Sequence, residues 1–565
     1  MQPLPPLFAF AILAMPLASN ASAWDVWTVC QTRRVLRDEL PEPAGAVRLA
    51  AARREWESFQ ILVRSSEPVR GVTIEPGDLR GPDGYVLPGA AARLYRQHAL
   101  YLSKATFRHP DFRPGWYPDA LIPFRHPTTR QPLADARFVA VPFELPAEQT
   151  HGFWVDICVP EDAPAGEYRG EYRVRAADGR ERTIPVKLTV WGFTLPRVAA
   201  LRTALGSPAS KLRGYYAYLV RNGQRSTAPD WQQVDRQCAE MLTRHRINVA
   251  PPPVGDLPIA RADGTFEVPS EMIVAFRRFV DTYHVNALQL PHPKTAVRDP
   301  VAEGEKLRRW LAAWDRAADA LDRPGVLFYI YLKDEPNDPA AYAEVRRWGE
   351  AIRAARSVVQ VLVVEQTRPQ QAAWGDLYGA VDIWCPLFAA FLPESAARRQ
   401  AAGETIWAYT ALCQGTPTPW WQIDRPLVNY RVPAWIAWRY RIRGLLYWGN
   451  MCYWEEVADP WTEPATFHTG GGFRRQVFNG EGTLVYPGRE VGFDGLVPSM
   501  RLKALRDAVE DYDYLYLLEK AGRAEEAERL VAPLVPDWFS WQTSPEAYEQ
   551  IRHKLAARLI ADATF

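Results

Sequence analysis

The chain has 565 residues, of which 47% are hydrophobic, and it carries 67 Lys and Arg against 66 Asp and Glu. This length allows two or three domains with substantial cores, and the composition excludes an intrinsically disordered protein. Because these charges balance, the chain has no overall charge to attract nucleic acid or anionic membrane, and we predict no nucleic-acid partner.

The first residues have the features of a secretory signal. Residues 7–17, "LFAFAILAMPL", form an apolar stretch of suitable length, and Ala21-Ser22-Ala23 is a small-residue cleavage site before Trp24. The stretch is too short for a membrane span and is interrupted by Pro16. We predict a signal peptide over 1–23 and a secreted or periplasmic protein with no integral membrane span after cleavage.

Residues 24–197 are predicted to form an antiparallel β-sandwich. Short runs such as "SFQILVRS" (58–65), "GEYRGEYRVRA" (166–176) and "TIPVKLTVWGF" (183–193) alternate apolar and polar residues and are separated by Pro, Gly and Asp. This period of two with frequent turn signals is typical of a sandwich.

From residue 198 to 565 the pattern changes to alternating strands and helices, which favours a (β/α)8 barrel of the TIM type. The tail from about 521 to 565 is predicted to add C-terminal helices. An open sheet is the alternative if one strand is absent. The eight predicted strands cover 201–206, 247–253, 285–291, 326–333, 359–364, 381–387, 405–412 and 444–450.

Two adjacent carboxylates, Asp334 and Glu335, follow the fourth predicted strand, "VLFYIYLK", and Pro336 stops it. In a barrel the chemistry is located where the strands end, so these acids are expected at its mouth. The structural alternative is a strand-end turn or a helix N-cap formed by Asp334 or Asp338.

Glycosidic bond cleavage usually needs two catalytic groups. Barrel glycosidases commonly place the second carboxylate on the seventh strand, but here that strand, "TIWAYTALC", has none. This favours a mechanism in which the 2-acetamido oxygen of the substrate attacks the anomeric carbon. Glu335 would act as acid and base, and Asp334 would orient the acetamido group. Because successive strand residues face opposite sides, both acids reach one sugar only if the strand ends or bulges near Asp334.

The segment "YLKDEP" resembles the catalytic region of glycoside hydrolase family 123 and of a related, largely uncharacterised bacterial domain family. Similar segments are "REWESFQILV", "WVDICVPEDAPAGEYRGEYRV", "GEGTLVYPG" and "PSMRLKALRDAVEDYDYLYLL". The resemblance implies a β-sandwich followed by a barrel and a β-N-acetylgalactosaminidase acting by substrate assistance. On the family's pattern Glu335 matches the acid/base and Asp334 the acetamide-orienting residue.

Aromatic and polar side chains near the predicted strand ends are candidates for binding a glycan. The chain has 22 Trp, and indole faces stack on sugars as readily as they fill cores. Trp448, at the end of the eighth strand, is the first candidate for a sugar platform. The other candidates are Trp384, Trp407, Trp420, Trp421, Trp454, Tyr409, Tyr447, Tyr453, Asn450 and His292.

Two alternatives stay open. Glu365, Glu455 or Glu456 would serve as nucleophile in an ordinary retaining glycosidase acting on a sugar without an acetamide. A non-catalytic carbohydrate-binding protein on the same scaffold is the second alternative.

Further predictions concern bound groups and the loops of the barrel. The nine His include no pair at metal-ligand spacing, so we predict no catalytic metal, and no cofactor motif is present. A disulfide between Cys413 and Cys452 is geometrically reasonable, because they follow neighbouring strands, and buried free thiols are the alternative. The Gly-rich stretch 470–495 is predicted to be a structured loop over the cleft, with Arg474, Arg475 or Arg489 as candidates for binding an acidic sugar or sulfate.

Overall fold

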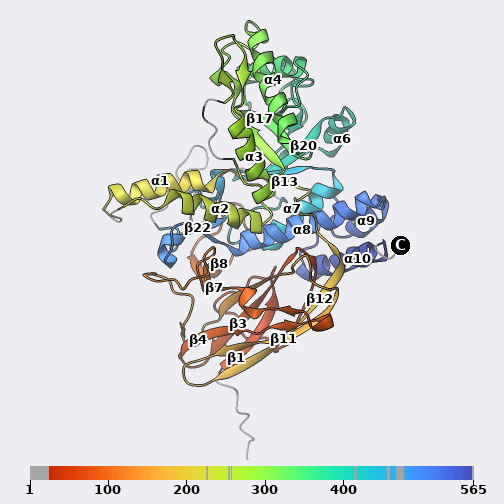
Figure 1. Cartoon of the computed structure of the whole chain (residues 1–565). Coiled ribbons are helices and arrows are strands. Elements are labelled where there is room, and N and C mark those ends of the chain that lie inside the picture. The colour runs from red at the N-terminus through yellow and green to blue at the C-terminus, as the bar shows by residue number, and fades with distance from the viewer. Residues whose placement is uncertain are drawn as a thin grey trace, which may run out of the picture.

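The computed structural model describes residues 24–223, 227–251, 255, 257–412, 417–454, 459–465 and 476–562. The predicted signal peptide therefore lies outside the described residues. Figure 1 shows a β-sandwich at one end of the molecule and a barrel-like α/β unit at the other, with the C-terminal helices between them.

The sandwich consists of two mainly antiparallel sheets. The first has the order β1-β3-β10-β7-β8, and the second contains β2-β12-β11-β4-β9 with β5 and β6 attached at β11. One pair, β2 with β12, is parallel. The strands are β1 (Trp24–Cys30), β2 (Val47–Arg53), β3 (Trp56–Ser65), β4 (Val69–Pro76), β5 (Leu79–Arg80), β6 (Val86–Leu87), β7 (Arg93–Leu102), β8 (Gly115–Pro123), β9 (Phe143–Leu145), β10 (His151–Cys158), β11 (Gly166–Arg175) and β12 (Glu181–Thr194).

The predicted alternation produces the core of the sandwich. On β11, Tyr168, Tyr172 and Val174 are buried while their neighbours are more exposed, and these side chains join Phe59 and Ile61 of the opposite sheet in one apolar cluster. This is the arrangement expected of strands with one buried face.

The barrel-like unit has a parallel sheet with the order β13-β21-β20-β19-β18-β17-β16. These strands are β13 (Arg202–Ala204), β16 (Ala287–Leu290), β17 (Leu327–Asp334), β18 (Gln360–Val364), β19 (Ile383–Trp384), β20 (Thr405–Thr410) and β21 (Gly444–Tyr447). Short antiparallel pairs are β14 (Ile259–Ala260) with β15 (Phe266–Glu267), and β22 (Val485–Pro487) with β23 (Leu496–Pro498).

The predicted second strand of the barrel, 247–253, is not part of a ladder among the described residues. Side-chain hydrogen bonds take the place of that ladder. The backbone N–H of Asn248 donates to Thr203 Oγ1 at 2.8 Å, and Asn248 Nδ2 donates to the carbonyl oxygen of Ala287 at 2.8 Å. Asn248 thus links β13 to β16, where the eighth strand of a regular barrel would stand.

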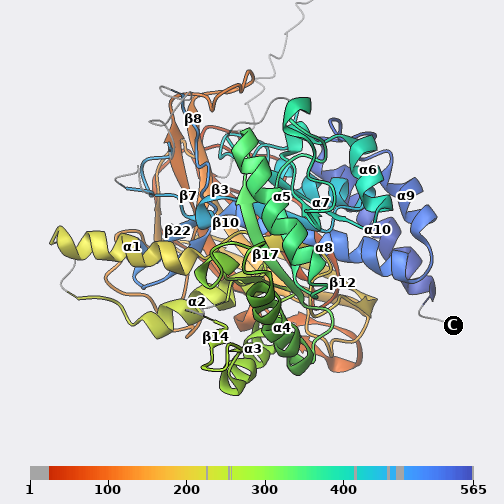
Figure 2. The same ribbon diagram turned by 90° about the horizontal axis from the view of Figure 1, so that it is seen from above.

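Helices cover the outside of this sheet, as the view from above shows (Figure 2). They include α3, α4 and α5, which follow one another around the strands. The helices are α1 (Pro208–Arg221), α2 (Trp231–Arg244), α3 (Ser270–Tyr283), α4 (Gly304–Leu321), α5 (Pro339–Ala354), α6 (Pro393–Ala401), α7 (Val428–Arg439), α8 (Met500–Lys520), α9 (Ala524–Val531) and α10 (Pro545–Asp562). Among the described residues no helix combines the length and the apolar composition needed to cross a membrane.

Helix α8 joins the two units through buried ion pairs. Arg501 pairs with Asp119 of β8, and Lys503 pairs with Asp156 of β10, at 2.9 and 2.6 Å. All four side chains are no more than 2% exposed. This explains why a helix so rich in charged residues is buried along nearly its whole length. Figure 1 shows α8 between the sandwich and the barrel-like unit. Loss of one partner would leave a buried charge, so the pairs hold the sandwich in a fixed position on the barrel.

Candidate active site

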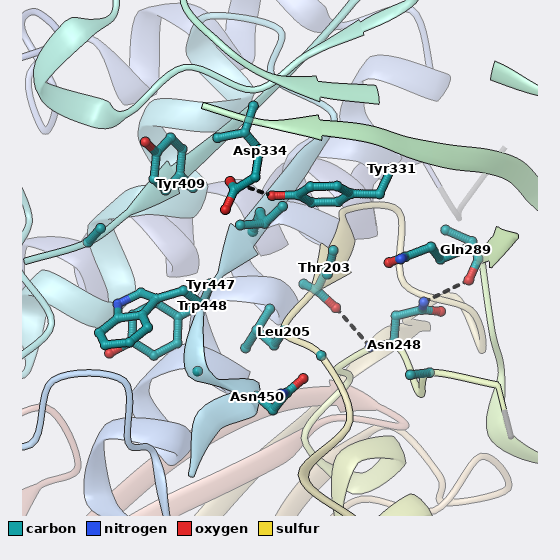
Figure 3. A pocket seen from close by; sticks show the side chains of 18 of the residues that line it. Thr203, Leu205, Asn248, Gln289, Tyr331, Asp334, Tyr409, Tyr447, Trp448 and Asn450 are labelled. Carbon is teal, nitrogen blue, oxygen red and sulfur yellow. Dashed lines mark hydrogen bonds between the residues drawn. The ribbon is translucent and has the colours of Figure 1, made fainter. Parts of the chain in front are cut away.

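A pocket of about 810 Å³ lies at the carboxyl ends of the barrel strands. Its floor contains Tyr329 and Leu446, which belong to the apolar cluster that fills the barrel interior. This is the position at which barrel enzymes hold their substrates. Residues from most of the strands contribute to the wall, and Glu335 is one of them. Others are labelled in Figure 3: Thr203, Asn248, Gln289, Tyr331, Asp334, Tyr409, Tyr447, Trp448 and Asn450.

An irregularity in β17 directs Asp334 into this pocket. Tyr331 pairs with Leu362 of β18 and Lys333 with the very next residue, Val363, so Leu332 is an extra residue in the ladder. Such a bulge shifts the alternation of the following side chains by one position. Asp334 therefore lines the same pocket as Tyr331, although the two are an odd number of residues apart.

The backbone then turns at Glu335, which has a φ of +38°. A non-glycine residue with positive φ is uncommon and marks a constrained position. Because of this turn the side chain of Glu335 lines the pocket together with that of Asp334. Lys333, in contrast, points to helix α5, where its Nζ lies 2.8 Å from Glu344 Oε2.

Each of the two acids accepts a hydrogen bond from a tyrosine. The hydroxyl of Tyr331 donates to Asp334 Oδ1 at 2.9 Å (Figure 3), and the hydroxyl of Tyr409 donates to Glu335 Oε1. Burial, together with the negative charge of Asp334, raises the pKa of Tyr331 far above its usual range. Tyr331 therefore stays protonated and acts as a donor that fixes one oxygen of Asp334.

Glu365 at the end of β18 is placed differently from the acid pair. It is 6% exposed and is absent from the wall of the pocket. Its Oε1 accepts from the backbone of Gln366 at 2.7 Å and its Oε2 from Gln370 Nε2 at 2.7 Å. Burial raises the pKa of Glu365, and the negative charge of Glu335 adds to this effect. Glu455 and Glu456 lie outside the described residues.

Of the candidate tryptophans, the structure brings Trp448 to the pocket. Trp407 packs inside the barrel against Tyr329, and Trp384 is buried with its indole N–H on Glu404 Oε2 at 2.6 Å. The remaining candidates, Trp420, Trp421 and Trp454, are also buried and do not line the pocket. Their positions are those of core residues.

The polar candidates divide in the same way. Asn450 and Tyr447 line the pocket, and Asn450 Oδ1 accepts from the backbone of Ser207 at 2.9 Å. His292 does not line it: its side chain caps a short turn by accepting from the backbone of Lys294. Tyr453 stands behind Trp448, with 5.0 Å between the ring centroids, and does not line the pocket.

Thr203, Asn248, Gln289 and Tyr331 line the pocket but were absent from the predicted set. All four lie in segments predicted as strands, and among the described residues only the segment of Asn248 forms no strand ladder. Polar residues within otherwise apolar strands are a signal for inward-facing positions, and this signal was available in "LRTALG", "INVAPPP" and "VNALQLP".

The remaining predictions concern a metal site, a disulfide and arginines that could bind an acidic sugar. Within the described residues no group of three or more His, Cys, Asp or Glu could hold a metal ion. Cys413, Arg474 and Arg475 lie outside those residues, so the predicted disulfide with Cys452 stays a prediction. Arg489 pairs with Glu490 at 3.7 Å and does not line the pocket.

Comparison with known families identifies this region. Residues 327–518, which begin with the acid-bearing strand, match the description "Glycoside hydrolase 123, catalytic domain". The chain carries a glycoside hydrolase family 123 catalytic domain. Asp334 and Glu335 lie within this family 123 domain, and the enzyme class predicted from the sequence is confirmed.

One of two similar solved structures supports the fold. A family 123 glycoside hydrolase from Clostridium perfringens is similar with a TM-score of 0.64 at 12% identity, over 96% of this chain and 100% of that chain. A family 39 glycoside hydrolase from Bacteroides cellulosilyticus reaches a TM-score of 0.31 at 10% identity, over 84% and 82%. The first likeness confirms the predicted order of sandwich, barrel-like sheet and C-terminal helices. No match was found among curated proteins.

Proposed function

We propose that this family 123 enzyme cleaves β-linked 2-acetamido sugars, with N-acetylgalactosamine as the preferred residue, by substrate-assisted catalysis. The observation that carries the proposal is the pairing of Asp334 and Glu335. They are the only acidic side chains among the described residues that line the pocket. The Clostridium perfringens relative is described as hydrolysing glycolipid glycans, which supports a glycoconjugate as the substrate.

In the first step the acetamido carbonyl oxygen attacks the anomeric carbon, and the bond from that carbon to the leaving oxygen breaks. Glu335, in its protonated form, transfers its proton to the leaving oxygen. Asp334 accepts the acetamido N–H and stabilises the positive charge that develops on the oxazolinium ring. The Tyr331 hydroxyl supports this role because it holds Asp334 Oδ1 and leaves Oδ2 for the substrate.

In the second step a water molecule attacks the anomeric carbon, and the bond to the acetamido oxygen breaks. Glu335, now a carboxylate, takes a proton from that water. The product keeps the β configuration because two displacements occur at the same carbon. Tyr409 contacts the carboxyl group of Glu335, so it is placed to stabilise the carboxylate form between the two steps.

A conventional retaining mechanism needs a second carboxylate that reaches the anomeric carbon. Among the described residues Glu365 is the strand-end candidate, but both of its oxygens already accept hydrogen bonds and it does not line the pocket. This supports substrate assistance over that alternative. The family match supports an enzyme over a non-catalytic binding protein. A secreted or periplasmic setting is also proposed, on residues 1–23 alone.

Hydrolysis of nitrophenyl β-N-acetylgalactosaminide tests the proposal. The parent enzyme is expected to release nitrophenol, and Glu335→Gln and Asp334→Asn are each expected to lower kcat by about 10²–10⁴-fold. Hydrolysis of a β-galactoside in preference to the 2-acetamido sugar would contradict the proposal. So would an Asp334→Asn variant as active as the parent.

A further inference from the structure

Behind the sugar pocket lies a buried carboxyl group that the mechanism does not use. Glu481 is 1% exposed and does not line the pocket. Its Oε1 accepts a hydrogen bond from the indole N–H of Trp448 at 2.7 Å and a longer one from the Tyr447 hydroxyl at 3.5 Å. Its Oε2 accepts from Gln422 Nε2. Both aromatic partners line the pocket themselves.

The turn that carries Glu481 is shaped for this contact. The flanking Gly480 and Gly482 have φ of +73° and +69°, values that glycine adopts without strain. A Cβ atom at Gly482 would lie 3.2 Å from the ring of Trp448, so the backbone approaches the indole closely. The backbone N–H of Gly482 also donates to the Tyr447 hydroxyl at 2.7 Å. The three residues "GEG" therefore hold two pocket aromatics from behind.

The surroundings of Glu481 give its carboxylate a defined electrostatic role. Among the described residues, Glu481 is faced by the donors Trp448, Tyr447 and Gln422 and by the charge of Arg501, which is itself paired with Asp119. Burial raises the pKa of Glu481 to about 7, although the hydrogen bonds and Arg501 oppose this rise. Burial also raises the pKa of Tyr447 well above its usual range, so Tyr447 remains a donor at every pH of interest.

We propose that Glu481 is a positioning residue that fixes the indole plane of Trp448, and with it the sugar-stacking wall of the pocket. The inference rests on the proposed sugar-binding function of this pocket. An indole held by one charged hydrogen bond and a close glycine presents its ring in one orientation, which is the geometry that stacking on a sugar face requires. Glu481 touches no substrate and acts through Trp448.

Protonation of Glu481 weakens this hold. The neutral carboxyl gains an O–H that faces a set of donors, and the charge-assisted bond to Trp448 becomes a neutral one. The KM of the parent is therefore expected to fall as pH rises through about 7, the pKa of Glu481. In Glu481→Gln, which cannot ionise, this dependence is expected to disappear. The amide keeps an acceptor oxygen for Trp448, so its KM is expected to stay within about threefold of the protonated parent.

A set of four variants tests the proposal by steady-state kinetics with nitrophenyl β-N-acetylgalactosaminide. Glu481→Ala is expected to raise KM about tenfold with a smaller change in kcat. Trp448→Phe keeps a ring but removes the N–H that binds Glu481. Because both changes remove the same contact, the double variant Glu481→Ala/Trp448→Phe is expected to have a KM no higher than that of the poorer single variant. Glu404→Ala removes a comparable buried contact, the one to Trp384 at 2.6 Å, and is expected to leave KM unchanged.

Additive losses in the double variant, or an equal rise of KM in Glu404→Ala, would overturn the proposal. A crystal structure of Glu481→Ala separates it from the proposed function, because it needs no turnover. A displaced Trp448 indole is expected, and an indole in its original plane would overturn the positioning role. If the parent cleaves no 2-acetamido glycoside, the proposed function fails, while the position of the indole still decides the role of Glu481. If Glu481→Ala does not fold, the pH dependence of KM in Glu481→Gln decides it instead.

Discussion

Tyr331 and Asp334 lie three positions apart on one strand, yet the Tyr331 hydroxyl donates to Asp334 Oδ1 at 2.9 Å. In a regular strand they would face opposite sides of the sheet. The extra residue Leu332 removes this obstacle, because it shifts the alternation by one position between them. The bulge therefore creates both the location and the orientation of the proposed acetamide-binding acid.

Replacement of Tyr331 tests the value of this contact. Tyr331→Phe removes the donor while keeping the ring, so Asp334 is less well oriented, and kcat/KM is expected to fall about tenfold. Tyr329→Phe is the matched control on the same strand, because its hydroxyl makes only a 3.4 Å contact with Gln289. Equal losses in the two variants would show that Tyr331 does not act through Asp334.

The roles of the two candidate glutamates can be separated by isosteric substitution. Glu335→Gln removes the proposed acid/base and is expected to lower kcat by about 10²–10⁴-fold. Glu365→Gln keeps the size and most hydrogen-bonding capacity of a residue outside the pocket wall, so its kcat is expected to stay within about tenfold of the parent. Steady-state rates on the same glycoside measure both. A collapse of activity in Glu365→Gln would revive the conventional retaining mechanism.

The buried ion pair of Arg501 and Asp119 connects the sandwich and the barrel-like unit, so its loss is expected to lower stability strongly. Arg501 donates three hydrogen bonds to Asp119, at 2.9–3.0 Å, and both side chains are fully buried. Arg501→Met is expected to lower the free energy of unfolding by about 3 kcal/mol, because the buried Asp119 then faces only the more distant cation Arg34, at 3.7 Å, among the described residues.

Arg113→Met provides the control for that change, measured by urea denaturation in the same way. Its pair with Asp38 has side chains that are 55% and 63% exposed, so the expected loss is below about 1 kcal/mol. Similar losses in the two variants would contradict the structural importance assigned to α8.

His98 is expected to make the free energy of unfolding depend on pH in the acid range. Burial lowers the pKa of His98 to about 4, and its Nε2 lies 2.7 Å from the carbonyl oxygen of Trp461. Between the unfolded pKa of about 6.5 and the folded value, only the unfolded chain binds the proton, so His98 lowers stability as pH falls through this range. His98→Gln is expected to make the free energy of unfolding less dependent on pH between about 4 and 6.5. An unchanged slope in urea titrations at several pH values would contradict this assignment.

The architecture was predictable because it depends on patterns that the sequence displays directly. Alternating runs predicted the sandwich, and repeated strand and helix segments predicted the barrel-like unit. The exception is 247–253, where the apolar run "INVAPPP" predicted a strand. There, side-chain hydrogen bonds from Asn248 replace the ladder, and no periodicity rule reveals such a substitution.

Of the candidate site, only the acid pair at its centre could be singled out from the sequence. The adjacent acids could be singled out because they follow a predicted barrel strand, where barrel enzymes place their chemistry. Their common direction depends on the bulge at Leu332 and the positive φ of Glu335. Neither has a distinct sequence signal. The number of tryptophans did not reveal which of them face the pocket. Trp384 and Trp407 are buried in the core, and tertiary packing decides this burial. Glu481 was missed because its importance follows from a contact with Trp448, 33 positions away.

The central claim is that the acetamido oxygen of the substrate acts as the nucleophile. The most direct test is kcat/KM for nitrophenyl β-galactosaminides whose N-acyl group carries none, one, two or three fluorine atoms. Fluorine withdraws electrons from the carbonyl oxygen, so the logarithm of kcat/KM is expected to fall steadily and steeply along the series. Rates that do not change with fluorine content would contradict substrate assistance and point to a nucleophile supplied by the protein.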